Sequence, residues 1–298
     1  MTAHIDCRSL AEVYLDWVRG QCSRLNTVPC IATLLRAGKA DEGSLQYRDL
    51  ILKDAERLGI RSRSLEASGE REFLGMVCEL NADPGVQGIV VLYPLGLSKT
   101  DEEVMDLVSP EKYIEGLHSI NLGYLIKYRR FLDRDRGIKC VVPATAKAVV
   151  KALQNYPQAR IKGAFATLVN NSMRVGKPLG LMLENLGATV VKCYDLTKGA
   201  DLEACVRRAD ILVTAVPDPA FKLDPGWVKD GAAVIDVSHS GNIDVERLEG
   251  RAALVSTPDN RIGRMTRAMT LVNLMYCTRP ARQERHSPRT HAEEAGRP

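Results

Sequence analysis

Hydrophobic positions along this chain follow two alternating patterns. Short continuous apolar runs predict buried strands, whereas apolar residues that recur every three or four positions predict amphipathic helices. In the first half, the predicted strands are residues 28–35, 60–65 and 88–92, and the predicted helices are residues 8–25, 42–58, 70–81 and 101–108. Such alternation implies parallel strands joined by right-handed crossovers.

The second half repeats the alternation more regularly. It predicts helices at residues 144–156, 178–186 and 201–209 and strands at residues 164–169, 188–194, 211–216, 231–237 and 253–255. A final helix, residues 265–277, is expected to return to the first half. The pattern indicates an α/β protein whose second half is a Rossmann-type nucleotide-binding domain. The polar, basic stretch 127–139 interrupts the alternation and is the predicted domain boundary.

Composition narrows the class of protein. The 298 residues are 45% hydrophobic and 26% charged, which is typical of a globular chain. The net charge of +4 does not indicate nucleic acid or membrane binding, and no apolar run is long enough for a spanning helix. The amino terminus lacks the apolar core of a signal peptide. Eight scattered cysteines without a C-x-x-C pair favour reduced thiols in a cytoplasmic protein and indicate no metal site.

The turn at residues 170–176, between a predicted strand and a predicted helix, is a candidate phosphate site. It has no G-x-G-x-x-G motif, and asparagines stand where a glycine-rich turn would begin. Asparagine tolerates left-handed backbone better than most residues, so the turn remains feasible. Ser172 and Arg174 are expected to meet phosphates near the amino terminus of the helix.

Asp195 is the stronger indication of a dinucleotide. It lies at the end of the next predicted strand, where an acid hydrogen-bonds the adenosine ribose diol of NAD. A carboxylate there repels a 2′-phosphate, so the position favours NAD over NADP if a dinucleotide binds. The alternative is that Asp195 is an ordinary polar loop residue.

The stretch 86–123 contains a candidate site for a second ligand. Its strand, residues 88–92, stops near Pro94, which cannot donate to a sheet and therefore indicates a turn. Glu115 and Gly116 then place a carboxylate on a loop where backbone can approach a ligand closely. Small ligands of open α/β sheets bind outside the carboxyl ends of strands. The alternative is an ordinary connection with a solvated acid.

Longer motifs, taken in order, resemble the methylenetetrahydrofolate dehydrogenase/methenyltetrahydrofolate cyclohydrolase family over nearly the whole chain. They are SLQY, LKDAERLGI, VQGIVVLYPL, PEKYIEGLHSINLG, VVPATAKAVV, SMRVGKPLGLMLENLGATV, ADILVTAVPDP, KDGAAVIDV and STPDNRIGRMT. The resemblance implies two α/β domains flanking a cleft, which folate enters from the first domain and nicotinamide from the second. It also implies a homodimer formed through the nucleotide-binding domain.

On this basis we expect three regions along the chain. A folate-binding domain is expected at residues 1–140, completed by the returning helix 265–278. The nucleotide-binding domain is expected at residues 141–264, and the charged tail 279–298 is expected to be disordered.

On the folate side, the functional residues that the resemblance implies are only partly present. Tyr47 matches the family tyrosine beside the pterin and is a candidate catalytic residue, but the family lysine expected four positions later is Ile51. Lys53 points well away from the Tyr47 face at about 100° per residue. The family glutamine is Leu92. Lysine and glutamine activate water and polarise the one-carbon bridge, so their replacement predicts impaired hydrolysis of methenyltetrahydrofolate.

Glu115 stands where the family aspartate anchors the pterin ring, which preserves the charge and adds a methylene. It is the second candidate catalytic residue, and Leu92 and Pro94 complete the predicted substrate-binding wall. His118 and Asn121 match the family H-x-x-N motif and are expected to order the loop after Glu115.

The nucleotide side also departs from the family. The family arginine that grips a 2′-phosphate is Asn171, and the family A-V-G segment reads A-V-P at Val216 and Pro217. Thr145 and Thr266 match positions that line the nucleotide side of the cleft. The predicted cofactor-binding residues are therefore Thr145, Asn171, Ser172, Arg174, Asp195, Val216 and Thr266.

The glycine-rich loop of the family is one residue shorter here and has lost glycines, at residues 257–266. Asp259 and Arg261 are predicted to bind substrate, because Arg261 and Arg264 suit a carboxylated or phosphorylated group. The alternative is that these arginines are solvated surface charges. His239 is either an acid or base near the cleft or an exposed histidine.

Three functions agree with this sequence. The first is a methylenetetrahydrofolate dehydrogenase without cyclohydrolase activity, because hydride transfer needs chiefly proximity and orientation. The second is a tetrahydrofolate enzyme adapted to other one-carbon chemistry in specialised metabolism. The third is a folate- or nucleotide-binding protein without catalysis.

Overall fold

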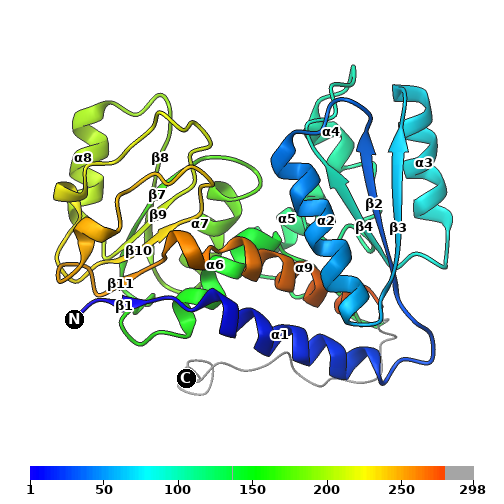
Figure 1. Ribbon diagram of the computed structural model, residues 1–298, viewed down its shortest axis with the longest axis horizontal. Coiled ribbons are helices and arrows are strands. Elements are labelled where there is room, and N and C mark those ends of the chain that lie inside the picture. Colours follow the sequence, from blue (N-terminus) through cyan, green and yellow to red (C-terminus); the bar gives the residue numbers. More distant parts are fainter. Residues whose placement is uncertain (136, 279–298) are drawn as a thin grey trace. The chain divides into compact units, whose positions relative to one another are not determined.

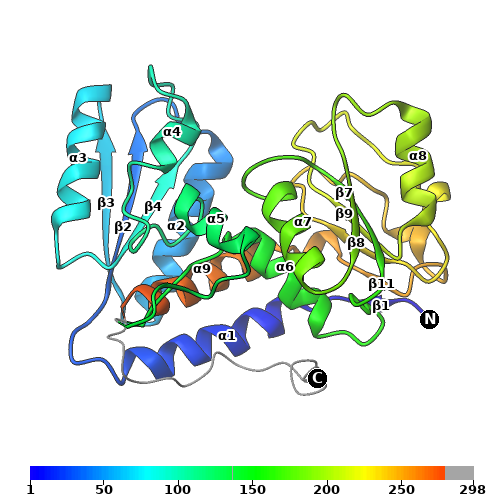
Figure 2. The same ribbon diagram turned by 180° about the vertical axis from the view of Figure 1, so that it is seen from behind.

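A computed structural model describes residues 1–135 and 137–278 (Figure 1, Figure 2). The chain divides into two compact units. The six-stranded unit comprises Met1–Val13 and Thr145–Thr266, and the three-stranded unit comprises Tyr14–Ala144 and the segment that begins at Arg267. The predicted tail, residues 279–298, lies outside the described residues. Within the described ranges, each helix is too short or too polar to cross a lipid bilayer.

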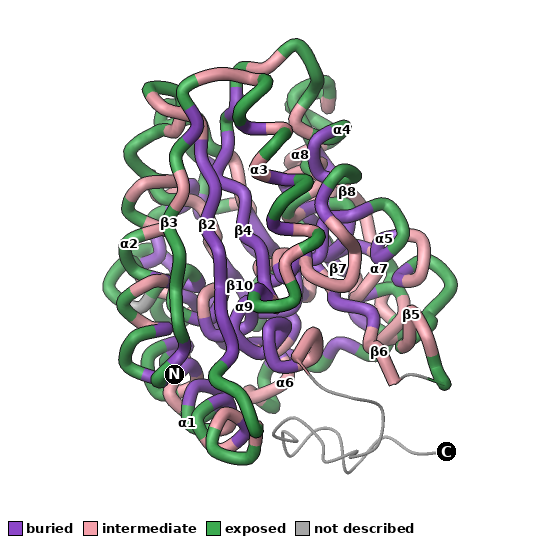
Figure 3. Tube along the Cα trace, turned by 90° about the vertical axis from the view of Figure 1, so that its right-hand side faces the viewer, coloured by how far each residue is buried: buried purple, intermediate pink, exposed green. Residues whose placement is uncertain are grey.

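The three-stranded unit is a parallel sheet in the order β3-β2-β4, with helices packed against it. Its strands are β2 (Cys30–Arg36), β3 (Arg61–Ala67) and β4 (Gly88–Leu92). Its helices are α2 (Glu42–Arg57), α3 (Glu70–Ala82), α4 (Asp101–Met105) and α5 (Ser119–Ile126), with most of α1 (Cys7–Cys22) and α9 (Gly263–Cys277). Figure 3 shows β2 and β4 buried along their length and the edge strand β3 largely exposed. Burial on both faces explains the continuous apolar runs of β2 and β4.

Parts of this unit differ from the predicted pattern. Helix α5 is absent from the prediction because its eight residues are too few to show a clear period. The stretch 127–139 contains the antiparallel strands β5 (Phe131–Asp133) and β6 (Ile138–Lys139), and the two units divide a few residues after it, between Ala144 and Thr145. Helix α4 is shorter than predicted and begins with a capping box between Thr100 and Glu103.

The six-stranded unit is a parallel sheet in the order β1-β11-β10-β9-β7-β8. Its strands are β1 (Ala3–His4), β7 (Phe165–Val169), β8 (Thr189–Cys193), β9 (Ile211–Thr214), β10 (Ala233–Asp236) and β11 (Leu254–Val255). Its helices are α6 (Ala144–Gln154), α7 (Gly176–Asn185), α8 (Gly199–Arg208) and the short turns η1 (Pro225–Trp227), η2 (Glu246–Leu248) and η3 (Pro258–Asn260). Strands and helices alternate along the chain, which is the predicted Rossmann-like arrangement.

The amino-terminal segment belongs to the six-stranded unit, whereas the predicted domain 1–140 assigned it to the other. The reason is that β1 pairs in parallel with β11 at the edge of the sheet, with Ala3 opposite Leu254. The Thr2 hydroxyl donates to the Ala252 carbonyl at 2.8 Å and accepts the Gly250 N–H at 2.8 Å. A strand of two residues has no readable period, so these contacts leave no signal in the sequence.

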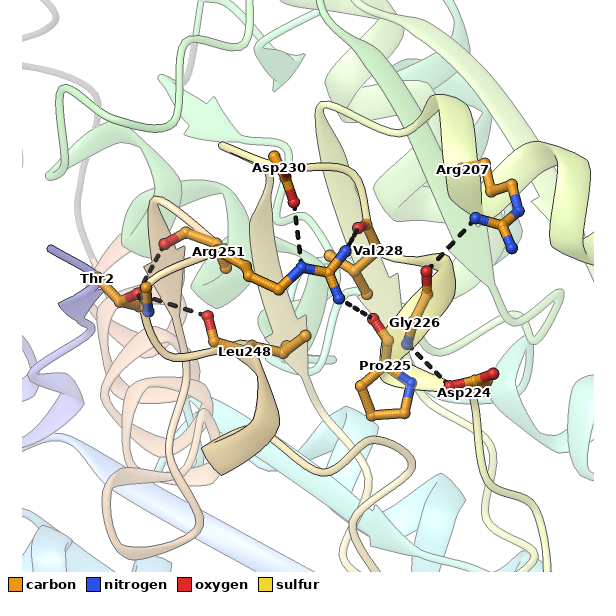
Figure 4. A network of polar contacts seen from close by, with 11 residues as sticks. Thr2, Arg207, Asp224, Pro225, Gly226, Val228, Asp230, Leu248 and Arg251 are labelled. Atoms are coloured by element: carbon orange, nitrogen blue, oxygen red, sulfur yellow. Dashed lines mark hydrogen bonds and ion pairs between the residues drawn. The ribbon is translucent and has the colours of Figure 1, made fainter.

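Arg251 holds the loops below this edge in place (Figure 4). Its guanidinium group donates to the Pro225 carbonyl at 3.2 Å and to the Val228 carbonyl at 2.7 Å, and it pairs with Asp230 at 3.1 Å. The planar, multidentate donor set of arginine suits such convergent carbonyl groups. Arg251 therefore ties the segment 225–230 to the segment that leads into β11.

Candidate active site

Helix α2 is tied to the end of strand β4 by its first turn. The Asp41 side chain caps the helix by accepting the Ser44 N–H at 2.7 Å, as aspartate commonly does at this position. The Ser44 hydroxyl donates to the Tyr93 carbonyl at 2.5 Å, just before the exposed Pro94. The start of α2 therefore lies beside the turn that ends β4.

Tyr47 and Ile51 lie one turn apart on α2. Tyr47 is half-buried, and its Oη lies 3.0 Å from Oγ1 of Thr270 on α9. The Ile51 side chain is fully buried. Lys53 is exposed. Helix α2 thus directs a phenol and an aliphatic side chain inward and its lysine outward.

The Glu115 carboxylate binds the backbone of β4. Its Oε2 accepts the Val91 N–H at 3.2 Å, next to Leu92, which is buried. Gly116 follows at a φ of 75°, and a Cβ there would lie 2.4 Å from the carbonyl carbon of Val142. Only glycine accommodates both the positive φ and this close approach. The tight turn thereby holds a carboxylate at the carboxyl end of β4.

Helix α9 fixes the same loop. The Asn273 side chain is fully buried, and its amide donates to the Ile114 carbonyl at 2.8 Å and to the Val142 carbonyl at 2.9 Å. Four predicted site residues therefore belong to segments that these contacts join in one unit; they are Tyr47, Leu92, Pro94 and Glu115.

His118 and Asn121 hold the segment after Glu115. Nδ1 of His118 accepts the Ile120 N–H at 3.0 Å and caps α5, and Oδ1 of Asn121 accepts the Val141 N–H at 3.2 Å. Burial lowers the pKa of His118, although the neighbouring Asp106 carboxylate opposes this effect. A neutral ring is required for the cap, since a protonated Nδ1 cannot accept a hydrogen bond.

In the six-stranded unit, Asn170 closes the turn between β7 and α7. Its Oδ1 accepts the N–H groups of Ser172 and Gly176, each at 2.9 Å, and also the Ser172 hydroxyl at 2.8 Å. A Cβ at Gly176 would lie 2.0 Å from the Asn170 carbonyl oxygen, so this one glycine is required. An asparagine side chain therefore takes the place of a glycine-rich turn. Asn171 is half-buried and Arg174 is exposed.

The other predicted cofactor-binding residues lie at the ends of strands or helices. Asp195 is exposed directly after β8. The Val216 backbone is held on both sides by the buried Asn242, which accepts its N–H at 2.8 Å and donates to its carbonyl at 3.0 Å. Thr145 and Thr266 are half-buried, near the start of α6 and of α9.

Three hydroxyl groups lie at the carboxyl ends of β9 and β10. Oγ1 of Thr214, Oγ of Ser238 and Oγ of Ser240 are buried atoms, and none has a hydrogen-bond partner among the described residues. Buried hydroxyl groups normally have a hydrogen-bond partner. A buried hydroxyl group without a protein partner commonly marks a place where a ligand or water binds. The end of the sheet where Rossmann-type units bind nucleotides therefore retains unused hydrogen-bonding capacity, which fits a nucleotide.

The loop 257–266 uses Arg261 to bind its own surroundings. Its guanidinium group donates to the Pro258 carbonyl at 2.9 Å and to the His239 carbonyl at 2.7 Å, and it lies 3.1 Å from Nδ1 of His239. Asp259, His239 and Arg261 are all exposed. The arginine is thus neither a freely solvated charge nor wholly available for a substrate.

Sequence reasoning missed Thr270, Asn273 and Asn242, which support Tyr47, the Glu115 loop and Val216. The first two had a detectable signal: they are polar residues three positions apart in the apolar second half of α9. Asn242 lies in an irregular loop and shows no such pattern.

Comparison with known proteins gives a consistent result. Residues 5–115 match the catalytic-domain model of the tetrahydrofolate dehydrogenase/cyclohydrolase family, and residues 143–282 match its NAD(P)-binding-domain model. The bifunctional protein FolD of Francisella philomiragia is 33% identical over 278 residues, covering 90% of this chain and 94% of that protein.

Two solved structures are similar along nearly their whole length. The 5,10-methylenetetrahydrofolate dehydrogenase of the silkworm Bombyx mori superimposes with a TM-score of 0.82 at 29% identity, covering 93% of this chain and 98% of that one. The methylenetetrahydrofolate dehydrogenase-cyclohydrolase (FolD) of Trypanosoma brucei, in complex with NADP and an inhibitor, gives a TM-score of 0.81 at 26% identity, covering 93% of this chain and 97% of that one.

Proposed function

Because the chain belongs to the tetrahydrofolate dehydrogenase/cyclohydrolase family, we propose that it oxidises 5,10-methylenetetrahydrofolate with a nicotinamide nucleotide and has lost cyclohydrolase activity. The membership supports a folate substrate and a nicotinamide nucleotide. The loss of the second activity rests on the residues of this chain.

The observation that carries this proposal is the aliphatic pair Ile51 and Leu92. Both side chains are buried, with 0% and 3% of their surface exposed, at the positions where the family resemblance implies lysine and glutamine. Neither can donate a proton, accept one or polarise a carbon–nitrogen bond, and hydrolysis requires such a group. Lys53 faces solvent and does not replace the missing lysine.

The folate-binding residues we propose are Tyr47, Leu92, Pro94 and Glu115. A flat heterocycle with N–H donors suits a tyrosine ring, an apolar wall and one carboxylate. Glu115 already accepts the Val91 N–H, and carboxylate oxygens can accept further hydrogen bonds from a pterin ring. Tyr47 and Glu115 are the groups we expect nearest the reacting carbon.

The nucleotide-binding residues that we propose lie at the turns after successive strands of the six-stranded unit. They are Asn171, Ser172 and Arg174 for the phosphates, Asp195 for the adenosine ribose, and Val216, Thr145 and Thr266 for the nicotinamide end. A bound nicotinamide ring supplies the hydride acceptor. The relative from T. brucei was solved with NADP, whereas Asp195 favours NAD in this chain because its carboxylate would repel a 2′-phosphate.

Hydride transfer does not require the missing lysine. The reaction removes a hydride from the methylene carbon and leaves a cationic methenyl product, so it depends on proximity, orientation and electrostatics more than on proton transfer. Because Ile51 stands where the family resemblance implies lysine, no ammonium group at that position repels the developing cation. The proposed loss of hydrolysis is therefore compatible with a retained oxidation.

The test uses purified protein with 5,10-methylenetetrahydrofolate and either NAD or NADP. We expect NADH to accumulate faster than NADPH, and 5,10-methenyltetrahydrofolate to decay no faster with the protein than in buffer. Hydrolysis above the buffer rate would refute the loss of cyclohydrolase activity. Tetrahydrofolate binding without any reduction of NAD or NADP would refute the dehydrogenase assignment and leave a binding protein.

The loop 257–266 supports a second candidate function, other one-carbon chemistry on tetrahydrofolate. Arg261 and His239 form a joined polar pair, and an arginine and a histidine suit an acidic co-substrate. This candidate predicts that an acidic acceptor, rather than NAD, stimulates consumption of methylenetetrahydrofolate. Arg261 and Asp259 would then bind that acceptor.

We also propose that the protein is a homodimer formed through the six-stranded unit. Strand β8 is the last strand of its sheet and remains half-exposed along most of its length. Its Val190 and Val191 are apolar side chains on an open edge, which proteins normally cover. Light scattering at several protein concentrations measures the oligomeric state, and a persistent monomer would refute the dimer.

A further inference from the structure

Helices α2 and α9 lie side by side (Figure 1). Two polar pairs join them, one at each end of the stretch of α2 that contains Ile51. Tyr47 Oη meets Thr270 Oγ1 at 3.0 Å, and Nε of Arg267 donates to Oδ2 of Asp54 at 2.7 Å. The two helices run antiparallel here, since Tyr47 precedes Asp54 on α2 whereas Thr270 follows Arg267 on α9. Tyr47, Ile51 and Asp54 are spaced by four and three residues, so they share one face of α2.

The contact at Thr270 differs in kind from the contact at Arg267. The Arg267–Asp54 pair joins two largely buried charges, with 13% and 18% of the side chains exposed, and it lies on the far side of Ile51 from Tyr47. The Thr270 side chain is completely buried, and it contacts the hydroxyl oxygen at the far end of the Tyr47 side chain, which fixes the direction in which that side chain leaves α2. A tyrosine ring with a held hydroxyl group has fewer orientations than a free one.

From this geometry we propose that Thr270 is a positioning residue for substrate binding: its hydroxyl group holds the Tyr47 ring in the orientation that receives the pterin. The inference rests on the proposed function, because it assigns Thr270 to the proposed folate-binding residue Tyr47. Thr270 does not itself touch the substrate. Its hydroxyl restricts the Tyr47 side chain before folate binds. Binding then loses less side-chain conformational entropy, and the affinity is higher.

The test compares Thr270→Val, which keeps the shape and removes the hydroxyl, with Thr270→Ser, which keeps the hydroxyl. Tetrahydrofolate binding is measured by titration calorimetry, and KM and kcat are measured with methylenetetrahydrofolate and NAD. We expect Thr270→Val to raise both Kd and KM about five- to tenfold with kcat nearly unchanged, and Thr270→Ser to restore the wild-type values. Tyr47→Phe removes the same hydrogen bond and should raise Kd for tetrahydrofolate by a similar factor, and the double variant should bind no more weakly than the weaker of the two single variants.

A matched control separates positioning from loosening of the two helices. Asp54→Leu combined with Arg267→Met removes the other pair as a whole, so that no buried charge is left unpaired. We expect this control to leave Kd within about twofold of the wild type, whatever its melting temperature. An equal rise in Kd in the control would overturn the proposal, because Thr270 would then act only through helix packing.

The two proposals fail in different ways. Wild-type protein that does not bind tetrahydrofolate refutes the proposed function and the role of Thr270 together. Wild-type protein that binds tetrahydrofolate, with an unchanged Kd in Thr270→Val, refutes the positioning role alone. If Thr270→Val does not fold, the Tyr47→Phe variant decides, since it removes the same hydrogen bond from the half-buried partner.

Discussion

The backbone N–H of Val91 donates a 3.2 Å hydrogen bond to Oε2 of Glu115. This contact fixes a carboxylate, longer by one methylene than the aspartate of the family pattern, at the carboxyl end of β4. The neighbouring Leu92 is buried and aliphatic. In the proposed folate site, Glu115 is the group that we expect to anchor the pterin ring, and Leu92 cannot activate water.

The first prediction concerns Glu115. Glu115→Gln keeps the size of the side chain and removes its charge, so hydrogen bonds to a pterin ring lose the contribution of an ionised acceptor, about 1.5 kcal/mol or more. We expect KM for methylenetetrahydrofolate to rise at least about tenfold and KM for NAD to stay unchanged. Steady-state kinetics checks this, with the exposed Glu102→Gln as control. An unchanged folate KM would remove Glu115 from the site.

The second prediction concerns Asp195 and the choice of nucleotide. Asp195→Ser removes the charge that would repel a 2′-phosphate, and it also removes the acceptor for the ribose diol. We expect kcat/KM with NADP to increase relative to NAD by about tenfold or more, since each factor of ten requires only about 1.4 kcal/mol. Asp201→Asn, an exposed acid in the first turn of α8, is the control for a general change of charge. An unchanged ratio in Asp195→Ser would show that this acid does not meet the ribose.

Some of this site was predictable from local sequence and some was not. Strand β4 has the predicted limits, and α2 begins at the predicted residue, because a continuous apolar run and a capped amphipathic stretch are local patterns. The positions of Tyr47, Ile51 and Leu92 follow from these two elements.

The contacts that complete the site are long-range and carry no local signal. Thr270 is 223 residues from Tyr47, and Tyr93 is 49 residues from Ser44. The placement of Met1–Val13 depends on the pairing of the two-residue strand β1 with β11. Nothing in the sequence of the first residues indicates this distant partner. Such pairings are decided by tertiary packing, which periodicity does not describe.

The third prediction concerns the pH dependence of stability through His118. Burial lowers its pKa in the folded protein, so between the folded pKa and the unfolded value near 6.5 the unfolded chain binds more protons. Stability contributed by this group is therefore complete above about pH 6.5 and is lost as the pH falls through the folded pKa. We expect the free energy of unfolding to decrease by about 1 kcal/mol from loss of the α5 cap on acidification.

Denaturant unfolding at pH 7.5 and pH 5.5 measures this effect. His118→Asn keeps a capping side chain without a titrating group, so its stability should change less between the two pH values. His239→Gln, at an exposed position, should retain the wild-type pH dependence. A His118→Asn variant with the full wild-type difference would show that other groups cause the acid sensitivity.

The fourth prediction concerns restoration of hydrolysis. Ile51→Lys with Leu92→Gln replaces the two aliphatic residues, but Ile51 is fully buried and its neighbour on the same face, Asp54, is already paired with Arg267. A new ammonium group would enter a buried region beside an occupied carboxylate, where desolvation lowers its pKa and destabilises the fold by several kcal/mol. We therefore expect this double variant to melt at a lower temperature and to hydrolyse methenyltetrahydrofolate no faster than buffer.

Adding Arg267→Met frees Asp54 to pair with the new lysine three positions before it, which restores charge balance on that face. The triple variant should recover part of the melting temperature and show hydrolysis above the buffer rate, measured by the loss of methenyltetrahydrofolate absorbance. Equal hydrolysis by the double and triple variants would show that the Asp54–Arg267 pair does not block the lysine.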